Sequence, residues 1–232
     1  MMPHDFSFAE HAPEFDSHIE QSIPGVRQLR SMCVGLSRRF VQNGTTVLDI
    51  GCSTGSLLSA IRHMNQPARL GARYVGIDAE RAFAPQWRER RAPNLTFQVC
   101  DARNFRGYRN LSLVTCLFTL QFLGESDRLP LLRRLHDALI PGGALIIAEK
   151  VFAPSAQLQD ALTFDYLDMK LQHFSEREVL GKERALRGQM RLWTEQQLVS
   201  ALCEAGFQSA NIVEIWRNYL FVAKLGIKTW ER

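Results

Sequence analysis

Val47-Leu48-Asp49-Ile50-Gly51-Cys52-Ser53-Thr54-Gly55-Ser56-Leu57 is the stretch that decides the fold of this chain. An aliphatic run leads into a turn with two glycines and then into a helical pattern. Such a run is typical of a buried parallel strand, and a glycine at its end lets the backbone approach a ligand without an interfering Cβ. Ser53 stands where dinucleotide-binding loops carry a glycine. The turn therefore predicts a nucleotide site that does not hold a pyrophosphate.

Strand and helix patterns alternate beyond this turn. Further strands are predicted over 73–77, 95–99, 111–118 and 144–150, and helices over 56–64 and 126–139. Pro141-Gly142-Gly143 is expected to break the chain before the strand at 144–150, and two last strands follow Phe207 and Tyr219. This alternation predicts one α/β domain with a seven-stranded, mostly parallel sheet that spans the whole chain, residues 1–232.

Two aspartates follow predicted strands, at the edge where open parallel sheets bind ligands. Asp78 ends the strand at 73–77, and Asp101 follows the strand at 95–99. A carboxylate at the first place can accept both hydroxyls of a ribose, and a side chain at the second can meet an adenine amino group. Either aspartate alone has the alternative role of a helix cap or turn. Together with Gly51, however, they predict an adenine nucleoside site.

Composition limits the other functions of the chain. Its 232 residues, with 46% hydrophobic content, fill one large domain, and no apolar run reaches the length of a membrane span. The five cysteines are odd in number and show no CxxC spacing, so we predict no disulfide framework and no metal site. The first ten residues lack the pattern of a signal peptide, and we expect a cytoplasmic protein.

A net charge of +4 and a pI near 8.9 raise the alternative of a nucleic-acid partner. The arginines are spread over several predicted elements with acidic residues nearby, and they lack the interleaved aromatics of single-strand binders. We therefore expect a small-molecule substrate and neither a nucleic-acid nor a membrane partner. His4, His11 and His18 recur every seven residues, a spacing that helical metal ligands do not use.

The order of strands, the turn at Asp49-Ile50-Gly51, Asp78, Asp101 and the late Glu204-Ala205-Gly206-Phe207 resemble the class I S-adenosylmethionine (SAM) dependent methyltransferases. Four strings are specifically similar to carboxy-SAM synthases, bacterial enzymes that modify SAM on the way to a tRNA wobble base. They are Ser22-Ile23-Pro24-Gly25, Asp49-Ile50-Gly51-Cys52-Ser53, Phe118-Thr119-Leu120-Gln121-Phe122-Leu123 and Ala148-Glu149-Lys150-Val151-Phe152. The resemblance implies a Rossmann-like fold with SAM as cofactor or substrate. It also implies a partly helical lid made of residues 1–25 and 151–193.

The resemblance implies that SAM lies along the ends of the strands. The residues predicted to contact it are Asp49, Gly51, Cys52, Ser53, Gly55, Asp78, Ala79, Asp101, Ala102, Cys116 and Phe118. Aromatic faces of the lid are expected to attract the sulfonium by about 2 kcal/mol in a desolvated chamber, although these rings also suit a simple seal. They are Phe6, Phe8, Phe15, Phe164, Tyr166, Phe174 and Trp193. Tyr166 is the leading candidate, because its hydroxyl can reach a polar group as well.

Three positions depart from the pattern of the carboxy-SAM synthases. The resemblance implies a tyrosine, an asparagine and an arginine where this chain has Val26, Cys116 and Ala201. Arginine clamps a carboxylate through paired hydrogen bonds that alanine cannot make. We therefore expect SAM to be bound but not carboxylated.

The chain also resembles azetidine-2-carboxylate synthases of bacterial secondary metabolism. This implies that the α-amino nitrogen of SAM attacks its own γ-carbon and expels methylthioadenosine. Tyr166, Asp165 and Glu149 are the predicted catalytic residues, with Asp168 as a further candidate base. The alternatives are methyl transfer to a small molecule, carboxy-SAM synthesis, and SAM binding without chemistry. The apolar stretch at 158–171 suits a homodimer, and lid packing explains the same pattern.

Overall fold

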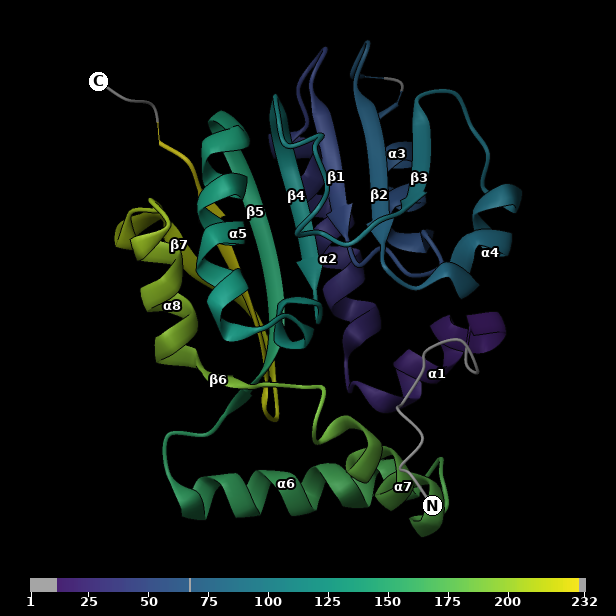
Figure 1. Ribbon diagram of the computed structural model, residues 1–232, viewed down its shortest axis with the longest axis vertical. Helices are drawn as coiled ribbons and strands as arrows, with labels where there is room; N and C mark the ends of the chain where they lie inside the picture. Colours follow the sequence, from purple (N-terminus) through teal and green to yellow (C-terminus); the bar gives the residue numbers. More distant parts are fainter. Residues whose placement is uncertain (1–11, 67, 230–232) are drawn as a thin grey trace.

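One sheet of parallel and antiparallel strands crosses the protein, with helices on both faces (Figure 1). The computed structural model describes residues 12–66 and 68–229. Its strands are β1 (Thr46–Ile50), β2 (Arg73–Asp78), β3 (Leu95–Val99), β4 (Leu111–Leu117), β5 (Leu139–Phe152), β6 (Trp193–Thr194), β7 (Ile212–Asn218) and β8 (Phe221–Ile227). Their order is β3-β2-β1-β4-β5-β8-β7, with β6 beside β5. The first five strands are parallel and β8 is antiparallel to both neighbours, which confirms the predicted fold class.

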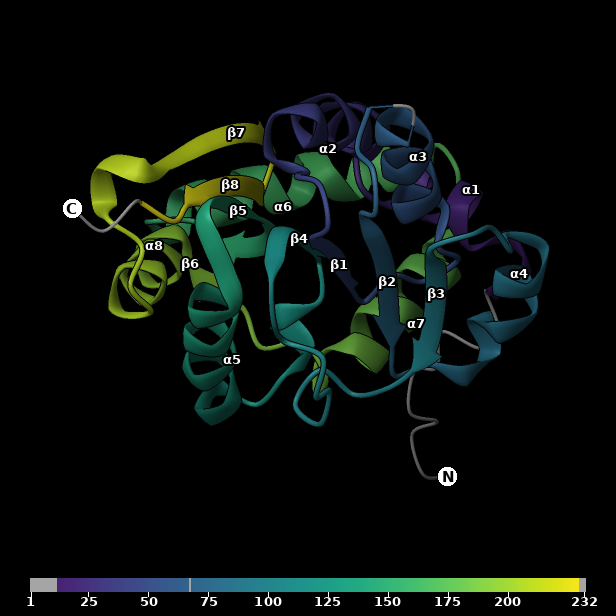
Figure 2. The same cartoon turned by 90° about the horizontal axis from the view of Figure 1, so that it is seen from above.

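The helices form two layers and a separate group at one end. One layer contains α2 (Val26–Phe40) and α3 (Ser56–Asn65), and the opposite layer contains α5 (Glu125–Ala138) and α8 (Glu195–Glu204) (Figure 2). The short α4 (Ala84–Glu89) lies beside β3. Below the carboxyl ends of the parallel strands lie α1 (Phe15–Ser22), α6 (Ala156–Leu171) and α7 (Glu176–Leu186) (Figure 1). None of the helices in residues 12–66 and 68–229 has the length and apolar character needed to cross a bilayer.

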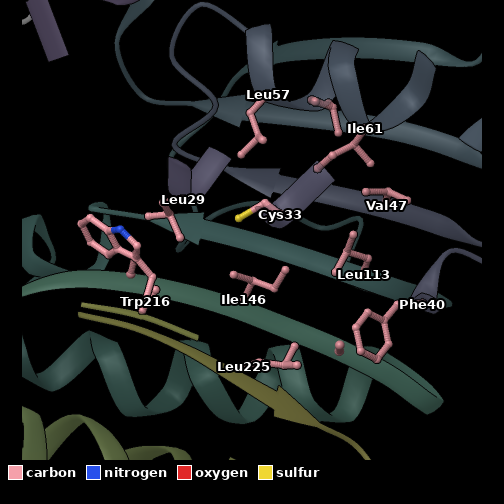
Figure 3. Close-up of a cluster of buried hydrophobic side chains, with 14 of the residues drawn as sticks. Leu29, Cys33, Phe40, Val47, Leu57, Ile61, Leu113, Ile146, Trp216 and Leu225 are labelled. Carbon is pink, nitrogen blue, oxygen red and sulfur yellow. The ribbon is translucent and has the colours of Figure 1, made fainter. Parts of the chain in front are cut away.

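The core between α2, α3 and the sheet explains why the aliphatic strands are buried. Leu29 and Cys33, one helical turn apart on α2, and Ile61 of α3 pack above Val47 and Leu113 (Figure 3). All five side chains are fully buried. Burial of each leucine or isoleucine contributes roughly 1.5–3 kcal/mol. A second hydrophobic cluster packs α5 and α8 against the other face of the sheet. Both faces are therefore covered by helices, and the ends of the strands remain available to form the site.

The Pro141-Gly142-Gly143 segment does not interrupt the chain before β5 as predicted. It forms part of β5, which begins at Leu139. Leu111 pairs with Leu139, whereas Leu113 pairs with Ala144, so this segment bulges out of the ladder. Gly142 adopts φ 76°, a conformation that favours glycine, and its N–H donates to the carbonyl of Lys228. The two last predicted strands are β7 and β8, and the two-residue β6 was not predicted.

Candidate functional site

The turn after β1 is shaped by residues with left-handed backbone conformation. Gly51 has φ 70° and Ser53 has φ 46°. A Cβ on Gly51 would lie 2.1 Å from Oγ1 of Thr119, so a larger residue does not fit there. Ser53 takes the place of the expected glycine, and its N–H donates to Oδ2 of Asp78 at 2.8 Å. The turn is thereby fixed to the end of β2.

A cavity of about 700 Å³ lies between this turn, the other strand ends and the lid helices. Its size is within the range of sites for small molecules and cofactors. The predicted SAM contacts that line it are Asp49, Gly51, Cys52, Ser53, Asp78, Ala79, Asp101, Ala102 and Phe118. Two predicted contacts are not in its lining. Gly55 packs against the ring of Phe97, and Cys116 is buried in the core beneath α5.

Asp78 and Asp101 are both held in place by hydrogen bonds to their carboxylates. Oδ1 of Asp78 accepts from the N–H of Glu80 at 2.8 Å, in addition to the bond from Ser53, and burial raises the pKa of this carboxyl. Arg103 donates to both oxygens of Asp101 and lowers its pKa. A carboxylate has about four lone-pair positions, so Asp78 can accept further hydrogen bonds from a ribose. The two oxygens of Asp101 are already occupied by the backbone N–H, Nε and Nη2 of Arg103.

Two further carboxyl groups, Asp49 and Glu149, are fully buried. The Thr115 hydroxyl donates to Asp49 at 2.6 Å, and burial raises the pKa of Asp49 to about 7. Glu149 accepts from the N–H groups of Leu120 and Gln121, both at 2.9 Å, and burial raises its pKa to about 8. It does not line the cavity, so we assign it to positioning the segment after β4 and no longer to catalysis. Among the described residues, no group of three or more His, Cys, Asp and Glu is arranged to hold a metal ion.

Glu149→Leu is expected to lower the free energy of unfolding by about 1–3 kcal/mol or more, because two buried N–H donors lose their acceptors. Glu149→Gln should cost less, since its amide oxygen still accepts one of these bonds. Denaturant melts without ligand measure both changes. Glu204→Leu is the control, because its side chain is 61% exposed and the expected change is within about 0.5 kcal/mol. Equal stability of Glu149→Leu and wild type would contradict the positioning role.

Three lysines that the sequence analysis missed gather at the lid end of the cavity, which we define by Lys150, Tyr166, Lys170, Lys182 and Glu183. They come from β5, α6 and α7. The Nζ atoms of Lys150 and Lys170 lie 5.0 and 5.1 Å from the centre of the Tyr166 ring. Nζ of Lys170 is 3.4 Å from Oε1 of Glu183. Lys150 lies in the string Ala148-Glu149-Lys150-Val151-Phe152 that the sequence analysis singled out, but Lys170 and Lys182 form no motif with it.

The lid end is electropositive. Burial lowers the pKa of Lys150 and lowers that of Lys182 to about 8. The ammonium of Lys170 adds to both effects, while Glu183 opposes them. Three amines therefore face one carboxylate in a buried setting. This corrects our expectation of an apolar aromatic chamber.

Tyr166 is the one predicted catalytic residue that lines the cavity. Its hydroxyl donates to the carbonyl of Ser22 at 2.8 Å, which ties α6 to the end of α1, and burial raises its pKa. Because the hydroxyl stays protonated and bonded to Ser22, it is a poor base. The ring is therefore the part of Tyr166 that remains available to contact a ligand in the cavity. Asp165 and Asp168 are exposed and lie outside the cavity lining, so neither is retained as a base.

The other aromatic residues of the lid occupy different environments. Phe15 lines the cavity, whereas Phe174 contacts His18 at a ring distance of 5.3 Å. Phe164 is 67% exposed and therefore faces away from the site. Trp193 covers the guanidinium of Arg128 at 4.7 Å, outside the cavity lining. Phe6 and Phe8 lie outside the described residues.

The structure also corrects the inference of a lost carboxylate clamp. Cys116 and Ala201 belong to the hydrophobic core between the sheet, α5 and α8. Neither lines the cavity, so side chains at these two positions give no evidence about a bound carboxylate. Of the three departures, only Val26 adjoins ligand space.

The chain has relatives along nearly its whole length. Residues 47–143 match the family model described as a methyltransferase domain. The carboxy-S-adenosyl-L-methionine synthase of Pasteurella multocida is 36% identical over 220 residues, which cover 91% of this chain and 88% of that protein. The enzyme of the same name from Klebsiella pneumoniae is 32% identical and covers 98% and 93%.

Solved methyltransferases share the fold at low identity. Human N-acetylserotonin methyltransferase, in complex with SAM, has a TM-score of 0.61 at 16% identity and covers 97% of this chain and 57% of its own. The N-methyltransferase NodS of Bradyrhizobium japonicum, in complex with S-adenosyl-L-homocysteine, has a TM-score of 0.58 at 14% identity and covers 90% of both chains. The chain therefore shares the fold of these methyltransferases.

Proposed function

Since this chain belongs to the carboxy-SAM synthase family of class I SAM-dependent enzymes, and uses SAM, we propose that it cyclises SAM to azetidine-2-carboxylate. The neutral α-amino nitrogen attacks the γ-carbon. The bond between that carbon and sulfur breaks, its electron pair stays on sulfur, and methylthioadenosine leaves. The ring nitrogen carries two hydrogens and the positive charge that the sulfonium has lost, so no second substrate is consumed.

The observation that carries this proposal is the electropositive lid end. The attack requires a neutral amine, and ammonium groups nearby disfavour the protonated form of another amine. Lys150 and Lys170 supply such groups in one cavity with Lys182, Tyr166 and Phe118. A folded methionine chain held among these side chains gains mainly from positioning and from exclusion of water.

The opposite end of the cavity suits the adenosine part of SAM. Asp78 lines the cavity and is held by two backbone N–H groups, which supports a role in binding the ribose; Asp101 and Ala102 line it as well, at the place proposed for adenine. With adenosine at the strand ends, the methionine chain extends toward Phe118 and Tyr166. This places the reacting amine at the end with the lysines.

A transfer reaction with a negatively charged second substrate is the other candidate, and the same three lysines favour it. The relatives are named carboxy-SAM synthases, and Cys116 and Ala201 no longer count against that activity. Glu183, however, places a carboxylate among the lysines, 3.4 Å from Nζ of Lys170. It offsets part of the positive charge that a dianionic donor would need, which favours cyclisation. Methyl transfer to a small anion has the same electrostatic requirement.

Incubation of the protein with SAM alone is expected to release equal amounts of methylthioadenosine and azetidine-2-carboxylate, measured by mass spectrometry. Buffer without protein is the control, because spontaneous breakdown of SAM also gives methylthioadenosine but yields homoserine products instead of the azetidine. Added prephenate, the carboxyl donor of the family, is expected to yield no carboxy-SAM. Formation of carboxy-SAM, or an azetidine yield no higher than in buffer from protein shown to bind SAM, would reject cyclisation.

A further inference from the structure

Lys182 has surroundings unlike those of the other two cavity lysines. Nζ of Lys182 lies 2.5 Å from Nε2 of His18 and 3.4 Å from Oγ of Ser22, and both partners belong to α1. The amine and the imidazole are therefore within hydrogen-bond distance of each other. Since His18 is only half-buried, the pair joins the cavity to a more exposed part of the lid.

The other two lysines contact aromatic rings or a carboxylate. Nζ of Lys150 faces the rings of Tyr166 and Phe221 at 5.0 and 5.8 Å, and aromatic faces stabilise an ammonium. Nζ of Lys170 lies 3.4 Å from Oε1 of the Glu183 carboxylate. Lys182 instead contacts an imidazole nitrogen of His18.

Charged groups from each neighbouring element act on Lys182. They are His18 on α1, Lys150 on β5, Lys170 on α6 and Glu183 on α7. Burial and the two lysines favour its neutral form, and Glu183 favours the charged form. The balance leaves Lys182 able to take up or release a proton close to physiological pH, which is where a general base is most effective.

We propose that Lys182 accepts the proton of the α-ammonium group of SAM and that His18 passes it toward solvent. This assignment rests on the proposed cyclisation. The amine Nζ of Lys182 takes one proton from the α-ammonium, and the freed nitrogen then attacks the γ-carbon while the carbon–sulfur bond breaks. The proton on Lys182 leaves through His18 before the next turnover, so that the amine can accept another proton.

Turnover at different pH values tests this role. Lys182→Met, which cannot take up a proton, is expected to lose about 100-fold in kcat at pH 7, a typical value for a lost general base. The loss should shrink as the pH rises, because the α-ammonium then loses its proton to solvent. A merely structural role would give a loss that does not depend on pH. Arg184→Met removes an exposed cation from the same helix and should retain full turnover.

A binding measurement separates this inference from cyclisation itself. S-adenosylhomocysteine has the α-amino group but no sulfonium leaving group, so it cannot cyclise. At pH 7 both its ammonium and Lys182 are mainly charged when free, and in the complex they should share one proton. Calorimetry in buffers of different ionisation enthalpy is expected to show release of about one proton by wild type and by Arg184→Met, and almost none by Lys182→Met.

The outcomes distinguish the two proposals. Proton release that depends on Lys182, without azetidine formation, would reject cyclisation but keep Lys182 as the partner of the substrate amine. The role of Lys182 would be rejected if the protein forms azetidine-2-carboxylate and the Lys182→Met variant keeps both the proton release and the pH profile of wild type. If Lys182→Met does not fold, both measurements are made on Lys182→Gln, which retains a polar contact to His18.

Discussion

Asp78→Ala is expected to weaken SAM binding by about 1.5–3 kcal/mol, the usual contribution of hydrogen bonds to a charged group. This corresponds to roughly a 10- to 150-fold rise in the dissociation constant. The expected cause is the loss of the acceptors for the ribose hydroxyls. The N–H groups of Ser53 and Glu80 hold this carboxylate at the cavity wall. The carboxylate is therefore already oriented before SAM binds. Calorimetric titration with SAM measures the change.

Two variants make this result specific. Asp78→Asn keeps the shape and one acceptor oxygen, so it should lose less affinity than Asp78→Ala. Asp137→Ala removes a carboxylate that is 83% exposed, and it should bind SAM like wild type. Thermal melts without ligand detect any loss of the turn contacts to Ser53 and Glu80. Unchanged SAM affinity in Asp78→Ala would remove this carboxylate from the site.

The sheet and the aspartates at its strand ends were predictable because their signals are local. An aliphatic run followed by Gly51 specifies a strand and a tight turn within a few residues. The parallel order then brings the ends of β1, β2 and β3 to one edge, so Asp78 and Asp101 meet there without further information. Ser53, which stands where dinucleotide-binding loops carry glycine, still adopts a positive φ. Its N–H donates to Asp78, so this departure is also explained by local contacts.

The lid end was not predictable, because its chemistry depends on which way side chains point after packing. Glu149 and Lys150 are neighbours in β5, and alternation sends them to opposite faces. Lys150 therefore lines the cavity, while Glu149 points away from it and accepts hydrogen bonds from the N–H groups of Leu120 and Gln121. Lys170 and Lys182 join Lys150 only through the packing of α6 and α7. Ala201 misled the prediction for the same reason, since a short motif does not show which helix face is buried.

Tyr166→Ala is expected to reduce turnover at saturating SAM by about 30-fold, which corresponds to the ~2 kcal/mol of a desolvated cation–π contact. SAM affinity should fall less than turnover. The folded methionine chain resembles the transition state more closely than the extended chain does, so a ring that favours the folded chain contributes more to turnover than to binding. The Tyr166 ring already attracts the ammonium groups of Lys150 and Lys170, so it can attract a sulfonium as well. Production of methylthioadenosine and a SAM titration measure the two quantities.

Tyr166→Phe separates the ring from the hydroxyl. Because that hydroxyl donates to the Ser22 carbonyl, its removal should cost about 1 kcal/mol of stability and leave turnover nearly unchanged. Phe164→Ala is the matched control, since this ring is on the same helix and is 67% exposed. If Tyr166→Phe were as impaired as Tyr166→Ala, the hydroxyl would be the functional group. If both variants turned over like wild type, the ring would have no part in holding the sulfonium, and Lys150, Lys170 and Lys182 would have to position the methionine chain without it.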